Sequence, residues 1–191
     1  MDVPSDTRDR LVRSTSRLLR TQGYAATGLN QVMAEADAPK GSMYFHFPGG
    51  KEELAAAAVD RFAERATARM QRHLAENATV REAVMAIFDA YVVHLDRTAF
   101  SEGCAVASVA LDGAATHGQL AEATGRALRG WTTMLSGALE AEGHPAERAH
   151  HLATLVLATI EGTIVMAKGE RSTEPIEAAR DALRTILTAP V

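Results

Sequence analysis

The apolar positions of this chain recur with the period of an α-helix almost everywhere, and no segment alternates in the manner of a strand. Leu11, Leu18 and Leu19 share one face of a first helix, which Gly23 is expected to end. We therefore predict an all-α protein of about nine helices. The second helix is expected from a Thr27 cap to near Asp37, the third from Pro39 to Phe47, and the fourth from there to about Asn77. The fifth follows a Thr79 capping box and runs through Leu95, and a short sixth lies within 100–116. The last three are expected from Leu120 to Gly143, from Pro145 to Gly169, and from about Glu174 to Leu187.

Two of these helices are short and only the residues 37–39 separate them, which is the spacing of a helix-turn-helix. Met43 and Phe47 fall four residues apart and turn inward. In a helix-turn-helix the second helix lies in the major groove of DNA, held by basic side chains, hydroxyls and helix N-termini. The residues available for that contact are Lys40, Gly41, Ser42, Tyr44 and His46, with Lys51 at the start of the next helix.

Spacing alone leaves a second interpretation open, in which Lys40 and Lys51 are ordinary solvated lysines beside a turn. The charge distribution favours neither interpretation strongly. The net charge is −4, and the residues up to Leu54 carry seven basic and seven acidic side chains, so a neutral head precedes an acidic body.

The motifs of the first 55 or so residues resemble the tetracycline-repressor (TetR) family of bacterial regulators. Thr27-Gly28-Leu29-Asn30-Gln31-Val32 matches the opening of its second helix, and Lys40-Gly41-Ser42-Met43-Tyr44 with Phe47 and Lys51-Glu52-Glu53-Leu54 matches its recognition helix. The segments 38–42, 47–51 and 103–109 are similar to the subgroup of lincomycin-resistance and flavonoid-responsive (LmrA/YxaF-like) repressors. The chain departs from the family at Asp37, where Gly is usual and a left-handed backbone is favoured, and at Phe45, where His or Tyr is common.

This resemblance implies a DNA-binding domain at 1–52 and a ligand-binding and dimerisation domain at 53–191. It implies a repressor that binds a palindromic operator in double-stranded DNA as a homodimer and leaves it when a small apolar or aromatic effector binds. The residues expected at the DNA are Thr27, Gln31, Lys40, Gly41, Ser42, Tyr44, His46 and Lys51.

The body of the chain offers candidates for an effector pocket and for a dimer contact. Aromatic and sulfur-bearing side chains suit an apolar ligand, although most residues of this kind are simply core. The pocket candidates are Phe88, Tyr91, Cys104, Trp131, Met134 and Met166; the dimer candidates, on the last two long helices, are Leu152, Leu155, Val156, Thr159, Ile160, Thr163, Leu183, Ile186 and Leu187.

Two other classes of protein compete with the regulator. One is a hydrolase or transferase using Cys104 with His94 or His117, for which spacing supplies no oriented base. The other is a helical interaction protein that does not bind DNA. We expect no catalytic residues, no cofactor and no metal, since His150 and His151 lack the i, i+4 spacing of a helical zinc site.

The single cysteine cannot form an internal disulfide, which favours the cytoplasm. The most apolar run, 152–167, contains Glu161 and is shorter than the ~20 residues that span a bilayer, so we expect no membrane segment.

Overall fold

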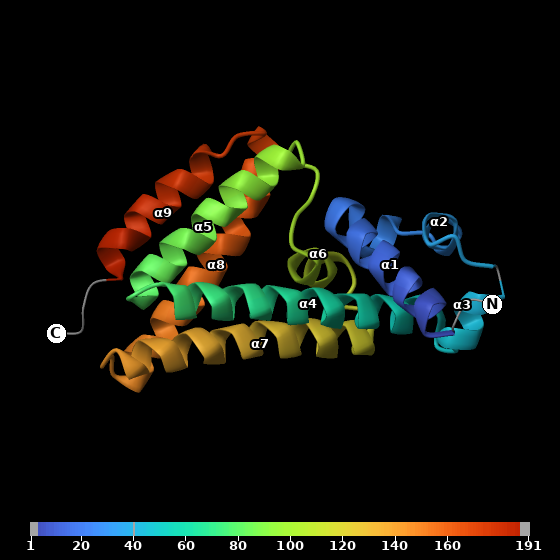
Figure 1. Cartoon of the computed structure of the whole chain (residues 1–191), viewed down its shortest axis with the longest axis horizontal. Helices are drawn as coiled ribbons and strands as arrows, with labels where there is room; N and C mark the ends of the chain where they lie inside the picture. Colours follow the sequence, from blue (N-terminus) through green and yellow to red (C-terminus); the bar gives the residue numbers. More distant parts are fainter. Residues whose placement is uncertain (1–3, 40, 188–191) are drawn as a thin grey trace. The chain divides into compact units, whose positions relative to one another are not determined.

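The computed structural model describes residues 4–39 and 41–187, and nine helices and no strand lie in them. The prediction of an all-α protein with about nine helices is thus confirmed. The helices, drawn in Figure 1, are α1 (Pro4–Ala26), α2 (Leu29–Glu35), α3 (Ser42–His46), α4 (Gly50–Glu76), α5 (Val80–Arg97), α6 (Ala105–Asp112), α7 (Gly118–Ala141), α8 (Ala146–Glu170) and α9 (Glu174–Ile186).

The chain forms two compact units, and α4 and α7 each contribute to both. The head unit consists of the chain up to Arg65 together with Cys104–Ala127, and the body unit consists of Ala66–Gly103 and the chain from Leu128 onward. This division differs from a boundary at residue 52, because the first turns of α4, all of α6 and the start of α7 pack with the amino-terminal helices.

The core of the head unit forms around α1, which packs against α2, α3 and α6. Its apolar stripe is the one read from the sequence, since Leu11, Leu18 and Leu19 are all buried. Val32 of α2 and Phe47, directly after α3, close over this stripe. Burial of side chains this size contributes about 1.5–3 kcal/mol each, so the two short helices are held by packing on α1 and need little helical stability of their own.

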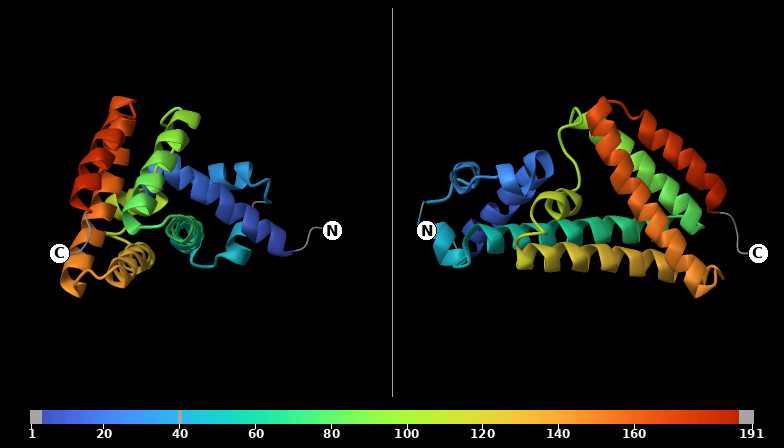
Figure 2. Two further views of the ribbon diagram at one scale, coloured as in Figure 1. Left: turned by 60° about the vertical axis from the view of Figure 1, so that its left-hand side comes forward. Right: turned by 180° about the vertical axis from the view of Figure 1, so that it is seen from behind.

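The body unit contains α5, α8 and α9, which lie side by side in all the views of Figures 1 and 2. The capping box at the start of α5 is present as predicted: the Glu82 N–H donates to the Thr79 hydroxyl, and the Glu82 carboxylate accepts from the Thr79 N–H, each over 3.2 Å. An Arg180–Asp89 ion pair joins α9 to α5 at the surface. The core between the three helices holds Phe88, Leu95, Val156, Ile160, Ile176 and Leu183.

The helices α4 and α7 lie side by side along their length (Figure 2). In the head unit Arg126 of α7 pairs with Asp60 of α4 at 3.0 Å. In the body unit the Trp131 indole N–H donates to the Thr67 hydroxyl over 3.0 Å. This bond satisfies the one polar group of a tryptophan that is otherwise buried.

Three predicted helix ends are wrong. The second helix is capped by Gly28 instead of Thr27, and the third begins at Ser42, three residues after Pro39. The eighth helix runs one residue past Gly169 and ends at Glu170, followed by the C-cap Arg171, whose φ of 51° is left-handed.

Candidate functional site

The turn between α2 and α3 is built on a left-handed residue. The Ala38 N–H bonds the Met33 carbonyl at 3.0 Å and the Asp37 N–H bonds the Ala34 carbonyl at 3.3 Å, which is the pair of bonds of a Schellman motif. Asp37 has a φ of 47°, so it occupies the position that glycine normally fills in this motif. The left-handed backbone expected at Asp37 is thereby confirmed.

An arginine of α1 holds this turn in place. The Arg10 guanidinium donates to the carbonyl of Ala36 over 2.9 Å and to that of Asp37 over 3.4 Å. These carbonyls end α2 and have no partner inside the helix. An ion pair, Arg17 with Glu35, ties the same end of α2 to α1. The angle at which the chain enters α3 is therefore fixed from α1.

The helix α3 is a little more than one turn long and has one buried side and one exposed side. Met43 is 1% exposed and Phe47, just after the helix, is fully buried, whereas Tyr44 is 61% and Phe45 77% exposed. The Ser42 hydroxyl donates to the Pro39 carbonyl over 2.7 Å, across the turn that opens the helix. The inward and outward assignment of Met43 and Tyr44 thus agrees with the sequence pattern.

The structure places the other predicted DNA residues around this helix in different ways. Thr27 is buried, and its hydroxyl donates to the Gly23 carbonyl over 2.5 Å. Gln31 is exposed, and its side-chain amide bonds that of Gln22 over 2.9 Å. Gly41 is exposed and His46 half-buried, with the His46 ring edge-on to Phe45 at 5.0 Å. Lys40 lies outside the described residues.

Lys51, at the start of α4, lies over an aromatic ring of the head. Its Nζ is 4.2 Å from the ring centroid of Tyr24 and donates to the Ala25 carbonyl over 3.5 Å. Burial lowers the pKa of the Lys51 ammonium, and the Asp112 carboxylate partly opposes this shift.

A group of contacts that the sequence pattern does not predict ties the amino-terminal helices to α6 and α7; we call it the head clamp (Tyr24, Glu52, Asp112, His117). The Asp112 carboxylate accepts from the Ala25 N–H over 3.0 Å, and the Glu52 carboxylate accepts from the Gln119 N–H, in the first turn of α7, over 2.9 Å. The Tyr24 ring meets the His117 ring edge-on at 4.9 Å. Burial, then Glu52, then Asp112, raise the pKa of the Tyr24 phenol.

Two glycines leave room for the approach of α6 to α1 in the head clamp. Gly23 has φ 78° and ψ 179°, and a methyl group there would lie 2.6 Å from the Asp112 carboxylate. A methyl group on Gly113 would lie 2.9 Å from Leu120 and 3.1 Å from the Tyr24 ring. One signal for this contact was present in the sequence, because a carboxylate at the C-terminal end of a helix, as at Asp112, is disfavoured by the helix dipole and needs a partner.

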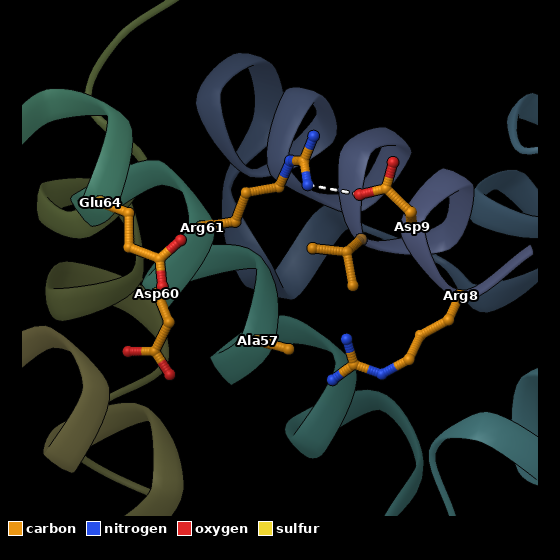
Figure 3. Close-up of a pocket in the computed structure, with 7 residues that line it drawn as sticks. Arg8, Asp9, Ala57, Asp60, Arg61 and Glu64 are labelled. Carbon is orange, nitrogen blue, oxygen red and sulfur yellow. Dashed lines mark hydrogen bonds and ion pairs between the residues drawn. The ribbon is translucent and has the colours of Figure 1, made fainter. Parts of the chain in front are cut away.

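A hollow of about 250 Å³ lies between α1 and α4 in the head unit (Figure 3). Charged side chains line most of it, and Asp9 pairs with Arg61 across it, as the dashed line shows. Such a charged hollow contributes little binding free energy to an apolar ligand. The lining residues are Arg8, Asp9, Val12, Ala57, Asp60, Arg61 and Glu64.

The candidates for an effector pocket are divided between the two units. In the body unit Phe88 and Trp131 are buried and Tyr91 and Met134 half-buried, while Cys104 is buried in the head unit. Met166 does not lie inside the body as expected: it is 52% exposed, because Ile160, Ile164 and Ala167 form the inner face of α8.

The dimer candidates fall into a buried and an exposed set. The buried set already belongs to the protomer's own core and comprises Leu152, Val156, Ile160, Thr163, Leu183 and Leu187. The exposed or half-exposed set comprises Leu155, Thr159 and Ile186. Leu155 shares the outer face of α8 with Ala158, Gly162, Val165 and Met166, which we call the outer stripe.

One helix of the described chain, α8, is long and apolar enough to cross a membrane by length and composition alone. Of its most apolar stretch, 44% is buried. The remaining apolar surface of this helix is the outer stripe. The described residues contain no cluster of three or more His, Cys, Asp or Glu side chains that could hold a metal ion.

Comparison with known proteins agrees with this arrangement over both parts of the chain. Residues 11–58 match the family described as bacterial regulatory proteins, tetR family, and residues 80–182 match the C-terminal domain of LmrA/YxaF-like transcriptional regulators. The HTH-type transcriptional regulator LmrA of Bacillus subtilis is 32% identical over 171 residues, which are 90% of this chain and 91% of LmrA.

Two further proteins extend the comparison. The HTH-type transcriptional repressor NemR of Escherichia coli is 26% identical over 198 residues, covering 97% of this chain and 96% of NemR. The crystal structure of a TetR transcriptional regulator from Chloroflexus aurantiacus superposes with a TM-score of 0.83 at 30% identity and covers 98% of this chain and 97% of its own.

These matches decide between the classes that the sequence left open. Proteins of this family are transcriptional regulators and not enzymes, so the alternative of a hydrolase or transferase built on Cys104 is wrong. The helix-turn-helix of α2 and α3 is the DNA-binding element that the family carries. The chain belongs to the TetR family of bacterial transcriptional regulators, with a carboxyl-terminal domain of the LmrA/YxaF type.

Proposed function

We propose that this regulator is a repressor that binds a palindromic operator as a homodimer and is released by a small apolar or aromatic effector. The observation that carries the proposal is the exposed edge of α3, Tyr44 and Phe45, on a helix that is otherwise anchored in the core by Met43 and Phe47. A rigid turn below it, held by Arg10, keeps this edge at a constant angle to α1.

Phosphate contacts would hold α3 in the major groove. We assign them to the Tyr44 hydroxyl and the Lys51 ammonium, while Ser42, His46 and Lys40 lie along the same segment and Gly41 allows close approach of the backbone. Thr27 and Gln31 would contribute only after giving up the bonds to Gly23 and Gln22. The DNA-binding part would then be residues 1–52, and 53–191 would bind the effector and the partner protomer.

The second protomer is needed because one helix-turn-helix reads only one half-site, and two half-sites about one DNA turn apart require two-fold symmetry. We assign the contact to the outer stripe of α8, with Ile186 of α9. Its small residues, Ala158 and Gly162, would let two helices approach closely. The sedimentation coefficient tests this: Ala158→Glu should give a monomer, while Ala75→Glu, an equally exposed change on α4, should leave the dimer intact.

Release requires an effector that binds the non-DNA state more tightly than the DNA-bound state. We place it in the body unit beside Phe88, Tyr91, Trp131 and Met134, whose bulk suits a flat apolar molecule. Trp131 is the only tryptophan of the chain, so quenching of its fluorescence by added aromatic compounds reports binding directly. Such a regulator would act in the cytoplasm, as proteins of this family generally do.

Binding of DNA upstream of the protein's own gene tests the main proposal. Each lost contact between a cation and a phosphate should flatten the plot of log Kd against log salt by ~0.9. We expect this from Lys51→Ala, and not from Arg129→Ala, which removes an exposed charge on α7. Tyr44→Phe removes a neutral hydroxyl, so it should weaken binding without changing this slope. Unchanged affinity and slope in both variants would refute the assignment of α3 as the DNA-binding helix.

A further inference from the structure

Phe45 is exposed on α3 to an extent that the fold does not explain. Its side chain is 77% exposed, and its ring meets the neighbouring His46 ring edge-on, with 5.0 Å between the centroids. The adjacent Tyr44 is turned differently: its Cε1 lies 4.0 Å from where a Cβ on Gly50 would be, so its ring leans toward the start of α4. Successive side chains of a helix point about 100° apart, so Phe45 leaves α3 in a different direction from Tyr44.

Three polar groups near α3 already have partners within the protein. The Ser42 hydroxyl donates to the Pro39 carbonyl. The Gln31 amide is bonded to Gln22, and the Lys51 ammonium lies over the Tyr24 ring. The Phe45 ring is presented outward and has no hydrogen bond to give up.

A phenyl ring has no hydrogen-bond donor or acceptor, so it cannot read the polar pattern of a base pair. The one apolar feature of the major groove is the 5-methyl group of thymine, which cytosine lacks. We propose that Phe45 contacts a thymine methyl group in each half-site and makes the protein select thymine over cytosine at that position. This inference rests on the proposed function, because it requires α3 to lie in the major groove.

The size of the effect follows from the burial of one methyl group. Removing it should weaken binding about fourfold, and about fifteenfold when it is removed from both half-sites of a palindrome. Because no phosphate is involved, the dependence of affinity on salt should not change. A variant without the ring lacks it in both protomers, so it should lose about fifteenfold in affinity and should no longer respond to the methyl group.

The experiment uses the full-length protein. Selection from a random pool of duplex DNA first yields the preferred sequence, and each thymine in it is then replaced singly by uracil, which keeps base pairing and removes only the methyl group. The wild-type protein should lose about fourfold in affinity at one symmetric pair of thymines. Phe45→Ala should bind all the uracil and thymine duplexes alike at these positions, and Phe45→Leu should keep part of the discrimination.

The outcomes separate this inference from the proposed function. If no sequence is enriched and no DNA is bound, the proposed function fails. If a sequence is enriched but no thymine responds to uracil in the wild type, or if Phe45→Ala responds as the wild type does, the assignment of Phe45 is overturned while the repressor stands. A changed salt slope in Phe45→Ala would show that the substitution acts through the phosphate contacts of other residues, and it would also overturn the assignment. Circular dichroism of this exposed-site variant checks that its fold is intact.

Discussion

Replacing Gly23 by alanine tests the head clamp most directly. The backbone at Gly23, φ 78° and ψ 179°, lies in a region that is essentially restricted to glycine, and forcing another residue into it costs about 1–3 kcal/mol. The added methyl group would also lie 2.6 Å from the Asp112 carboxylate and push it off the Ala25 N–H. That bond is at the surface, where its loss costs about 1 kcal/mol.

The two contributions together predict a loss of about 3 kcal/mol in the free energy of unfolding. For a chain of this length this lowers Tm by about 6–12 °C. Calorimetry at one fixed protomer concentration measures it, since the stability of an oligomer depends on concentration. Gly130→Ala is the matched control: its methyl group meets open space within α7, and it should stabilise the protein by up to about 1 kcal/mol.

A double-mutant cycle with Asp112→Ala isolates the contact itself. Without the carboxylate there is nothing for the methyl group to displace, so the double variant should be more stable than the sum of the single changes predicts, by about 1 kcal/mol. Strict additivity, or a Gly23→Ala protein within about 0.5 kcal/mol of the wild type, would show that α6 is not held to α1 in the way described.

Three further predictions concern single sites. Asp37→Gly should raise the free energy of unfolding by about 0.5–1 kcal/mol, measured by thermal unfolding, because glycine adopts a φ of 47° without strain. Thr79→Ala should lower it by about 1 kcal/mol through loss of the α5 capping box, and Thr79→Ser should restore it. In an ultraviolet titration one tyrosine should ionise above the usual pKa of about 10, and Tyr24→Phe should abolish that component. Since the folded-state pKa of Tyr24 is raised, its contribution to stability is present below pH ~10 and is lost above it. The free energy of unfolding should therefore fall above that pH in the wild type, and fall less in Tyr24→Phe.

The elements predicted well from the sequence are those that depend on residues close together in the chain. The 3.6-residue period located the helices, and the Thr79 capping box and the left-handed Asp37 follow from preferences of a few neighbouring residues. Thr27 shows where local reasoning stops. Its hydroxyl could accept a hydrogen bond from a backbone N–H of α2 or donate one to the Gly23 carbonyl. In the structure it donates to Gly23, whose backbone is not helical.

The head clamp could not be predicted because its partners are distant in sequence. Asp112 and Ala25 lie 87 positions apart, and Glu52 and Gln119 lie 67 apart. No periodicity connects such pairs; only the packing of α6 on α1 does. The exposure of Met166 could not be predicted for the same reason. The sequence places it in a helix, but only the packing of the other helices shows which face of α8 is exposed.

The bonds from Arg10 to the end of α2 limit how this protein can vary. Inserting or deleting one residue in α1 between Arg10 and the residues that pack on α6 would turn Arg10 by about 100° around the helix axis, away from the carbonyls of Ala36 and Asp37. Point substitutions on the solvent side of α1 carry no such penalty. Divergence in this helix should therefore proceed by exchange of residues at constant length, and an engineered chimera of two such regulators should keep the residue count from Arg10 onward unchanged.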